Sequence, residues 1–182
     1  MSLLQTLREA TSASHETLDA AFGSLDLSSR EDYVRFLRGH AIGLAPLFDS
    51  FREFVEGELD LSCPDYPAML QSDLAALGED PSALPQAHEP AALRSAATSY
   101  VIAGSRLGLA MIRKNGYWGR AHQQPSAYME DDQGLAIWKH LAARLKEWFP
   151  DEEEAAGQQA SAIVAFETFR EAFAISALAP TR

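Results

Sequence analysis

The sequence contains a single cysteine, Cys63, among its 182 residues. One thiol supports no intrachain disulfide framework, no zinc site built on paired thiolates and no Cys-x-x-Cys-His haem attachment. Basic residues are also scarce, because 15 Lys and Arg stand against 26 Asp and Glu, for a net charge of −11. That balance disfavours nucleic acids and anionic membrane surfaces as partners, since both attract basic faces.

Long apolar runs are missing as well. No stretch approaches the roughly 18 consecutive apolar residues that span a bilayer. Residues 1–5 have neither a basic start nor a continuous apolar core, so they do not form a signal peptide. We therefore expect a cytoplasmic protein that does not associate with membranes. Alternating strand patterns are absent too, whereas 47% apolar and 23% charged residues are typical of a globular chain.

What is present is helical periodicity along nearly the whole chain. We expect a single all-α domain over residues 1–182, a helical bundle of about six to eight helices. Three prolines between residues 79 and 90 predict a loop, and Asn115-Gly116 predicts a helix end that is followed by a loop to Pro125. The expected helices are residues 3–22, 29–56 with a kink or split at Pro46, a short helix from about Pro67 to Gly78, 91–114, 126–148 and 151–178.

Residues 100–108, with the sequence YVIAGSRLG, place two glycines inside one of these helices. Each costs roughly 0.5–1 kcal/mol relative to alanine. Because Gly104 and Gly108 are four residues apart, they lie on one face of the helix. The pair predicts that something flat or bulky approaches the backbone there, either a neighbouring helix or a ligand.

His15 lies on an apolar stripe of the first helix. Asp19, four residues later, is placed to accept a ring N–H directly or through water, which leaves the other ring nitrogen free for a metal. Arg8 lies about 10 Å before His15 along the helix axis. This separation suits a ligand with a metal centre and a negatively charged edge, such as haem with its propionates. A buried structural histidine is the alternative interpretation.

Residues 15–19 (HETLD) and 100–108 together resemble the haem oxygenase family, in particular its bacterial, bacteriophytochrome-associated branch. Residues 7–11, 32–37, 73–78 and 165–169 also fit. The resemblance implies haem b as both cofactor and substrate, and cleavage by O2 to biliverdin, CO and ferrous iron. Electrons would come from an external reductase or ferredoxin acting as the electron-donor protein, and a bacteriophytochrome would accept the biliverdin.

The same resemblance implies roles for individual residues. His15 would be the proximal iron ligand, Asp19 its partner and Arg8 a propionate contact. Gly104, Ser105 and Gly108 would form the catalytic distal wall, with Tyr100, Leu107 and Met111 against the haem. Two positions depart from the family pattern: Ala103 replaces a usual glutamate, and Leu109 replaces a second glycine and is expected to narrow the distal pocket.

Other interpretations stay open. A non-catalytic haem carrier or sensor, and a haem-free helical interaction module, fit the same helices. A di-iron site is disfavoured, because no histidine follows an acidic residue by three or four positions. His40, near Phe36 and Leu37, could contact a ligand, but a position in the core or at its boundary is favoured. Lys139 or Arg144 could reach a propionate. Two basic groups are candidate docking sites for an electron donor: Arg35 with Arg38, and Arg113 with Lys114 and Arg120.

Overall fold

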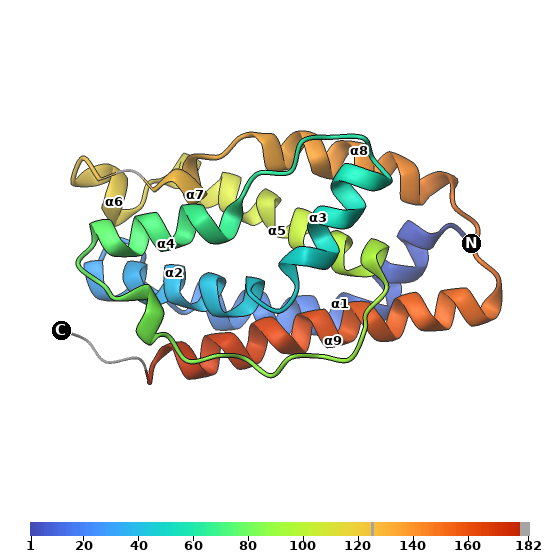
Figure 1. The fold of residues 1–182 in the computed structure, drawn as a ribbon, viewed down its shortest axis with the longest axis horizontal. Coiled ribbons are helices and arrows are strands. Elements are labelled where there is room, and N and C mark those ends of the chain that lie inside the picture. Colours follow the sequence, from blue (N-terminus) through green and yellow to red (C-terminus); the bar gives the residue numbers. More distant parts are fainter. Residues whose placement is uncertain (125, 179–182) are drawn as a thin grey trace.

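The chain folds into a bundle of α-helices in the computed structural model, which describes residues 1–124 and 126–178 (Figure 1). Within that part there is no strand, and seven helices have ten or more residues, which confirms the all-α prediction. Pro125, the expected loop end, and residues 179–182 of the expected domain lie outside the described residues. The elements are α1 (Leu3–Gly23), α2 (Arg30–Leu44), α3 (Phe48–Gly57), α4 (Tyr66–Ala76), the 3-10 turn η1 (Pro81–Ala83), α5 (Ser95–Asn115), α6 (Trp118–Ala121), α7 (Ala127–Glu130), α8 (Gln133–Glu147) and α9 (Glu152–Ser176).

Local sequence signals set most helix boundaries. The side chains of Ser29, Asp65 and Asp151 each accept a backbone N–H three residues later, so they cap α2, α4 and α9. The predicted helix over residues 29–56 is split around Pro46 into α2 and α3, as expected. Gly116 ends α5 at a φ of 93°, a conformation that favours glycine.

The predicted helix over residues 126–148 is wrong as a single element, because it breaks at Asp131. This residue is extended, with φ −57° and ψ 129°. Its carboxylate accepts the backbone N–H of Gln133 at 3.2 Å and of Gly134 at 3.0 Å. These bonds satisfy donors at the start of α8, so the chain restarts a helix there instead of continuing α7.

The start predicted for the helix over residues 91–114 is also wrong, since α5 begins at Ser95. Arg94 precedes it in an extended conformation, with φ −69° and ψ 121°. Its N–H donates to Ser161 Oγ on α9 at 3.0 Å. A tertiary partner therefore holds this segment out of the helix.

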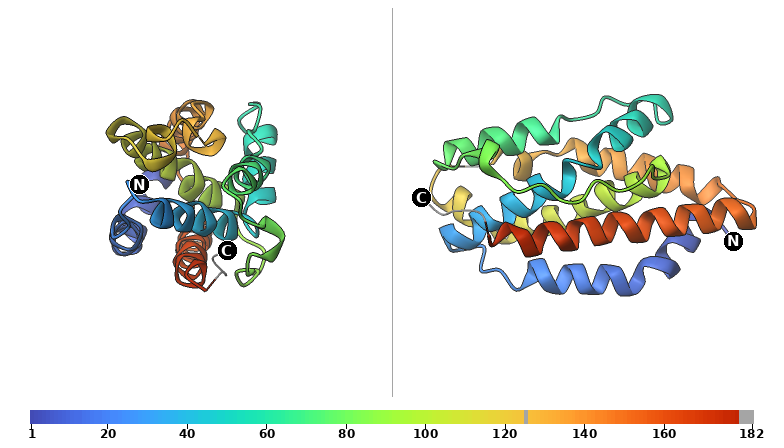
Figure 2. Two further views of the ribbon diagram at one scale, coloured as in Figure 1. Left: turned by 90° about the vertical axis from the view of Figure 1, so that its left-hand side faces the viewer. Right: turned by 60° about the horizontal axis from the view of Figure 1, so that its bottom comes forward.

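Helices α1, α5 and α9 run in the same direction along the bundle, whereas α2 and α8 run in the opposite direction (Figure 1). Figure 2 shows α1 and α9 side by side, and the segment between α4 and α5 runs along α9. Helix α5 lies in the middle of the bundle and packs against α3, α8 and α9. No helix in the described part of the chain is both long and apolar enough to cross a membrane.

Candidate functional site

A cavity of about 670 Å³ lies between α1 and α5. Its size falls within the roughly 300–1,000 Å³ that is usual for small-molecule sites. Helices α2, α8 and α9 complete its walls through Phe36, His40, Trp138, Phe166 and Phe169. All nine residues that the sequence predicts for the site line this cavity: Arg8, His15, Asp19, Tyr100, Gly104, Ser105, Leu107, Gly108 and Met111.

His15 presents its imidazole to the cavity from α1. Its Nδ1 lies 2.9 Å from Asp19 Oδ2, so the contact is direct. Because a carboxylate only accepts, Nδ1 carries the proton and Nε2 is left with its lone pair. The ring packs against Phe166 of α9 at 5.5 Å between centroids, and its side chain is 52% exposed. A carboxylate that fixes one ring nitrogen in this way leaves the other nitrogen free for a ligand.

The two glycines of α5 face different surroundings. A Cβ added to Gly104 would lie 3.5 Å from the Trp138 ring, an ordinary van der Waals contact. A Cβ added to Gly108 would meet nothing within 4 Å. A close approach by a neighbouring helix is therefore not the reason for Gly108, which opens onto the cavity instead.

The polar side chains on the α5 wall of the cavity include two hydroxyl groups, those of Ser105 and Tyr100. The Ser105 hydroxyl donates to the Ile102 carbonyl at 2.7 Å, so it is engaged within its own helix. Tyr100 reaches across to α1, with its hydroxyl 3.5 Å from that of Thr11. None of the nine α5 residues that line the cavity carries an imidazole or a carboxylate.

The rim of the cavity is apolar on one side and charged on the other. Leu107 and Met111 of α5 are 47% and 58% exposed, unusual values for large apolar side chains on a cavity rim. On α1, Arg8 is exposed and makes no ion pair with any described residue. Glu16 and Asp19 follow further along the same helix. Exposed apolar groups at a cavity mark a binding surface.

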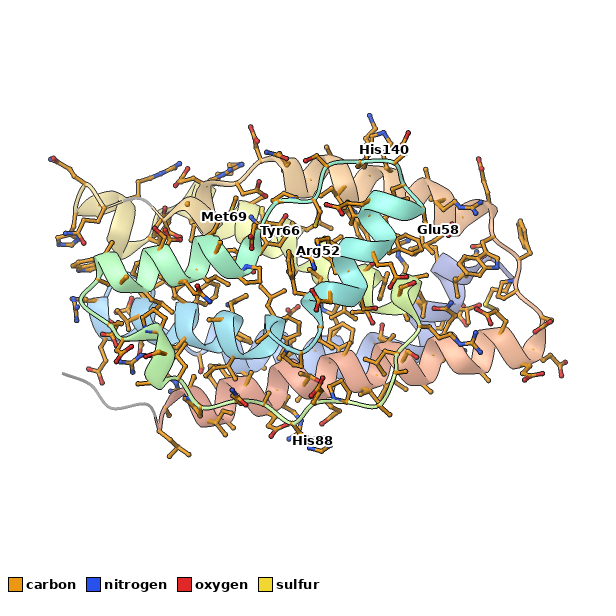
Figure 3. All side chains as sticks on the ribbon, viewed as in Figure 1. Arg52, Glu58, Tyr66, Met69, His88 and His140 are labelled. Atoms are coloured by element: carbon orange, nitrogen blue, oxygen red, sulfur yellow. The ribbon has the colours of Figure 1, made fainter. Side chains whose placement is uncertain are left out.

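The positions next to the glycines differ in where they face. Ala103, fully buried, points into the core and does not line the cavity. Leu109 is 3% exposed and lines the cavity beside Gly108. On α8, Lys139, His140 and Arg144 are outside the cavity lining, so the idea that Lys139 or Arg144 reaches a propionate has no support in the geometry. Figure 3 shows His140 on the outer side of α8 and His88 on the segment between α4 and α5.

His40 was expected in the core or at its boundary, and it is both buried and part of the cavity wall. Its Nδ1 donates to the Phe36 carbonyl at 2.9 Å. Burial lowers the pKa of His40 to about 4; the positive charge of Arg106 lowers it further, and the Phe36 hydrogen bond only partly opposes this. The imidazole is therefore neutral at physiological pH. Its place near Phe36 and Leu37 indicated burial, and a ligand contact was the less favoured alternative.

Sequence reasoning missed the role of Arg106, which lies in the glycine segment but faces away from the cavity. Its Nη2 lies 3.2 Å from Asp131 Oδ2 and 2.7 Å from the Tyr128 carbonyl. The guanidinium lies 4.6 Å from the ring centroids of both Tyr66 and Tyr128. Burial raises the pKa of both tyrosines. This buried cluster ties α5 to the junction between α7 and α8.

The prediction that Arg35 and Arg38 form a docking site for an electron donor is wrong. Arg38 is buried and pairs with Glu79, while the Arg35 guanidinium lies 4.4 Å from the Phe173 ring centroid. Both side chains therefore serve internal packing and do not form a free basic face.

In the second basic group, Arg113 and Arg120 interact with Glu130, whereas the side chain of Lys114 does not. Arg113 donates to the Glu130 carbonyl at 2.9 Å, and Arg120 pairs with the Glu130 carboxylate at 2.5 Å. Lys114 is exposed. The pair at Glu130 cancels part of the positive charge, so the group offers only a weak basic surface.

Comparison with solved structures shows that this all-α arrangement is the haem oxygenase fold. The chain is similar to the haem oxygenase of Neisseria meningitidis, whose crystal structures have NO and CO bound, with a TM-score of 0.62 and 22% sequence identity. The match covers 99% of this chain and 97% of that one. No protein-family model matches the sequence, and no curated protein matches it significantly.

Proposed function

We propose that the protein is a haem oxygenase, which uses O2 and electrons to cleave haem to biliverdin, CO and ferrous iron. One observation carries the proposal: the cavity has an imidazole fixed by a carboxylate on one wall and an open glycine on the facing wall. A metal ion held by protein ligands alone would need several of them. No group of three His, Cys, Asp or Glu side chains converges among residues 1–124 and 126–178. Haem supplies four nitrogen ligands itself and needs one axial nitrogen from the protein.

On the α1 wall, His15 would hold the haem through Nε2, and Asp19 would fix the tautomer and the ring orientation. Arg8 has a guanidinium without an ion-pair partner in the described structure, which suits a propionate at the rim. Haem, when bound, supplies both the iron that activates O2 and the porphyrin that is cleaved. The protein binds and orients it.

On the α5 wall, Gly104 and Gly108 would let the macrocycle approach the backbone, and Leu107 and Met111 would cover its outer part. Neither an imidazole nor a carboxylate of α5 faces the cavity. The α5 wall therefore offers no general base of its own, whereas a peroxidase uses a distal base. The neutral imidazole of His40 lines the cavity from α2.

The finer proposals rest on the resemblance of residues 15–19 and 100–108 to the bacterial branch of the family. They are haem b as the form bound, an external reductase or ferredoxin as electron donor, and a bacteriophytochrome as acceptor of the biliverdin. Of the two basic groups considered for donor docking, the one around Lys114 and Arg120 offers a weak basic surface.

A haem carrier or sensor without turnover is the second candidate. Leu109 favours it, because its buried side chain occupies the wall beside Gly108 where the family has a second glycine. A narrower distal side would hinder ring attack more than it hinders haem binding.

Titration of the purified protein with haemin tests the haem site. We expect a shifted Soret band, lost or strongly altered in His15→Ala and retained in His140→Ala, which removes an exposed histidine outside the cavity. A wild-type spectrum that stays that of free haemin, or one that is the same in His15→Ala, would overturn the proposal.

Adding a reductant and O2 to the complex then separates enzyme from carrier. Loss of the Soret band with growth of biliverdin absorbance supports a haem oxygenase. A Soret band that persists under these conditions supports the carrier or sensor and refutes turnover.

A further inference from the structure

Met111 places an exposed thioether on the rim of the cavity. Its side chain lines the cavity from α5 and is 58% exposed. Long side chains on a helix lean over the turn that precedes them, so we expect the thioether to cover Leu107 and Gly108. Leu107 is itself 47% exposed, and Gly108 has open space where a Cβ would stand. The sulfur therefore lies on the side of the cavity that is open to solvent.

Among the described residues that line the cavity, Met111 is the only one that contains sulfur. Met69 is partly buried on α4 (Figure 3), and Met129 is 1% exposed. Met1 is exposed but is not part of the lining. Cys63 also lies outside the lining, and burial raises the pKa of its thiol to about 12, so the reactive thiolate is not populated. An oxidant that forms in the cavity meets a single reactive sulfur.

A thioether is oxidised directly by hydrogen peroxide, to the sulfoxide. Peroxide forms whenever O2 takes up two electrons from the donor and two protons from solvent without ring cleavage. The sulfur attacks one peroxide oxygen, an S–O bond forms and the O–O bond breaks. The sulfur gives up two electrons, and the second oxygen leaves as water with both protons of the peroxide. The reaction therefore needs nothing beyond O2, electrons and protons.

We propose that Met111 is a modification site, which peroxide released in the cavity oxidises to the sulfoxide, and that this oxidation weakens haem binding. The inference rests on the proposed function, because it needs reduction of O2 in the cavity. Oxidation turns an apolar side chain into a polar one. The side chain of Leu107 is apolar and Gly108 has none, so haem would bury the S=O group without a donor from this turn. We expect about tenfold weaker haemin binding, equivalent to about 1.4 kcal/mol.

The first test begins without haem. The haem-free protein is treated with hydrogen peroxide, and peptide mass spectrometry follows each methionine. Met111 should become the sulfoxide well before Met69 and Met129. Haemin titration before and after this treatment should then show the tenfold loss of affinity in the wild type and in the control Met69→Leu. Whatever affinity Met111→Leu starts from, peroxide should leave it unchanged.

Methionine sulfoxide reductase should restore the affinity of the oxidised wild type. A Met111 that oxidises no faster than Met129 overturns the proposal. An equal loss of affinity in Met111→Leu, or no loss in the oxidised wild type, overturns it as well.

The second test follows Met111 while haemin is turned over with a reductant under ¹⁸O2. Catalase and free methionine are present in the solution, so that peroxide reaching the bulk is destroyed and the free methionine stays reduced. Met111 should still become the sulfoxide, with the heavy isotope in its S=O group, because it meets the peroxide before catalase does. A Met111 that stays reduced, or a sulfoxide without the isotope, overturns the proposal.

These outcomes are separable from failure of the proposed function. If the wild-type protein binds no haemin, the haem oxygenase proposal falls and the modification site falls with it. If haemin is bound and cleaved but Met111 stays reduced, only the modification site falls. If haemin is bound and not cleaved while Met111 gains the isotope, the modification site stands and the proposed turnover falls.

Discussion

Replacing His40 by glutamine is expected to make the protein less sensitive to mild acid. The folded protein keeps this imidazole neutral, because burial lowers its pKa to about 4. An unfolded histidine titrates near pH 6.5. As the pH falls below about 6.5, the unfolded chain gains a proton that the native state refuses, so the free energy of unfolding declines until the folded pKa is reached.

The size of this effect follows from the two pKa values. A pH of 5 is about 1.5 units below the pKa of His40 in the unfolded chain. It is still about one unit above the pKa of His40 in the folded protein. At about 1.4 kcal/mol per unit, the wild-type protein should lose about 2 kcal/mol relative to neutral pH through His40 alone. The carboxylates that titrate in the same range are common to both proteins and cancel in the difference.

The assay is urea unfolding of wild type and His40→Gln at pH 7.5 and pH 5. Any intrinsic cost of the substitution appears at both pH values and drops out. A matched variant, His140→Gln, removes an exposed histidine and should follow the wild type. If wild type and His40→Gln lose the same free energy between the two pH values, then His40 is not held neutral and the reasoning is wrong.

Three further substitutions test other parts of the site. Gly108→Ala should stabilise the protein by up to about 1 kcal/mol in urea unfolding, since its Cβ meets nothing within 4 Å, and should weaken haemin binding; unchanged binding would place the ligand elsewhere. Arg106→Met should lower the free energy of unfolding by about 3–5 kcal/mol, because it leaves the buried Asp131 carboxylate without its ion-pair partner. Adding Asp131→Asn should restore part of this loss. Strictly additive losses of the two single variants would contradict a direct interaction between the two side chains. Gly43→Ala should cost about 1–3 kcal/mol in thermal unfolding, because its Cβ would lie 2.5 Å from the Phe169 ring, and a neutral effect would show that this ring moves freely.

Sequence alone predicts the features that depend on neighbours along the chain. The expected helix starts at residues 29 and 151, where Ser29 and Asp151 act as caps, and the split at Pro46 depend on residues within one turn of a helix, so their signals are local. The contact between His15 and Asp19 is equally local, because residues four apart on a helix are adjacent.

Features that depend on distant partners could not be predicted. The carboxylate of Asp131, which satisfies the N–H groups at the start of α8, is also held by Arg106 and Tyr66, which are distant in the sequence. The late start of α5 follows from Ser161. The sequence favours a core position for His40 over a ligand contact, and only the tertiary arrangement shows that α2 reaches the cavity. A period of apolar residues identifies which face of a helix is buried, but not whether that face meets another helix or an open space.

The pairing of the first helix with the last has a consequence for the order of assembly during translation. His15 rests on Phe166 and Phe22 on Phe173, so α1 is supported by residues almost the whole chain away. A ribosome-bound chain that has emerged only as far as α5 already contains both facing walls, yet the helix that backs His15 has not been synthesised. Long-range contacts of this kind form late. Haemin capture by stalled nascent chains should therefore begin only once α9 has left the exit tunnel.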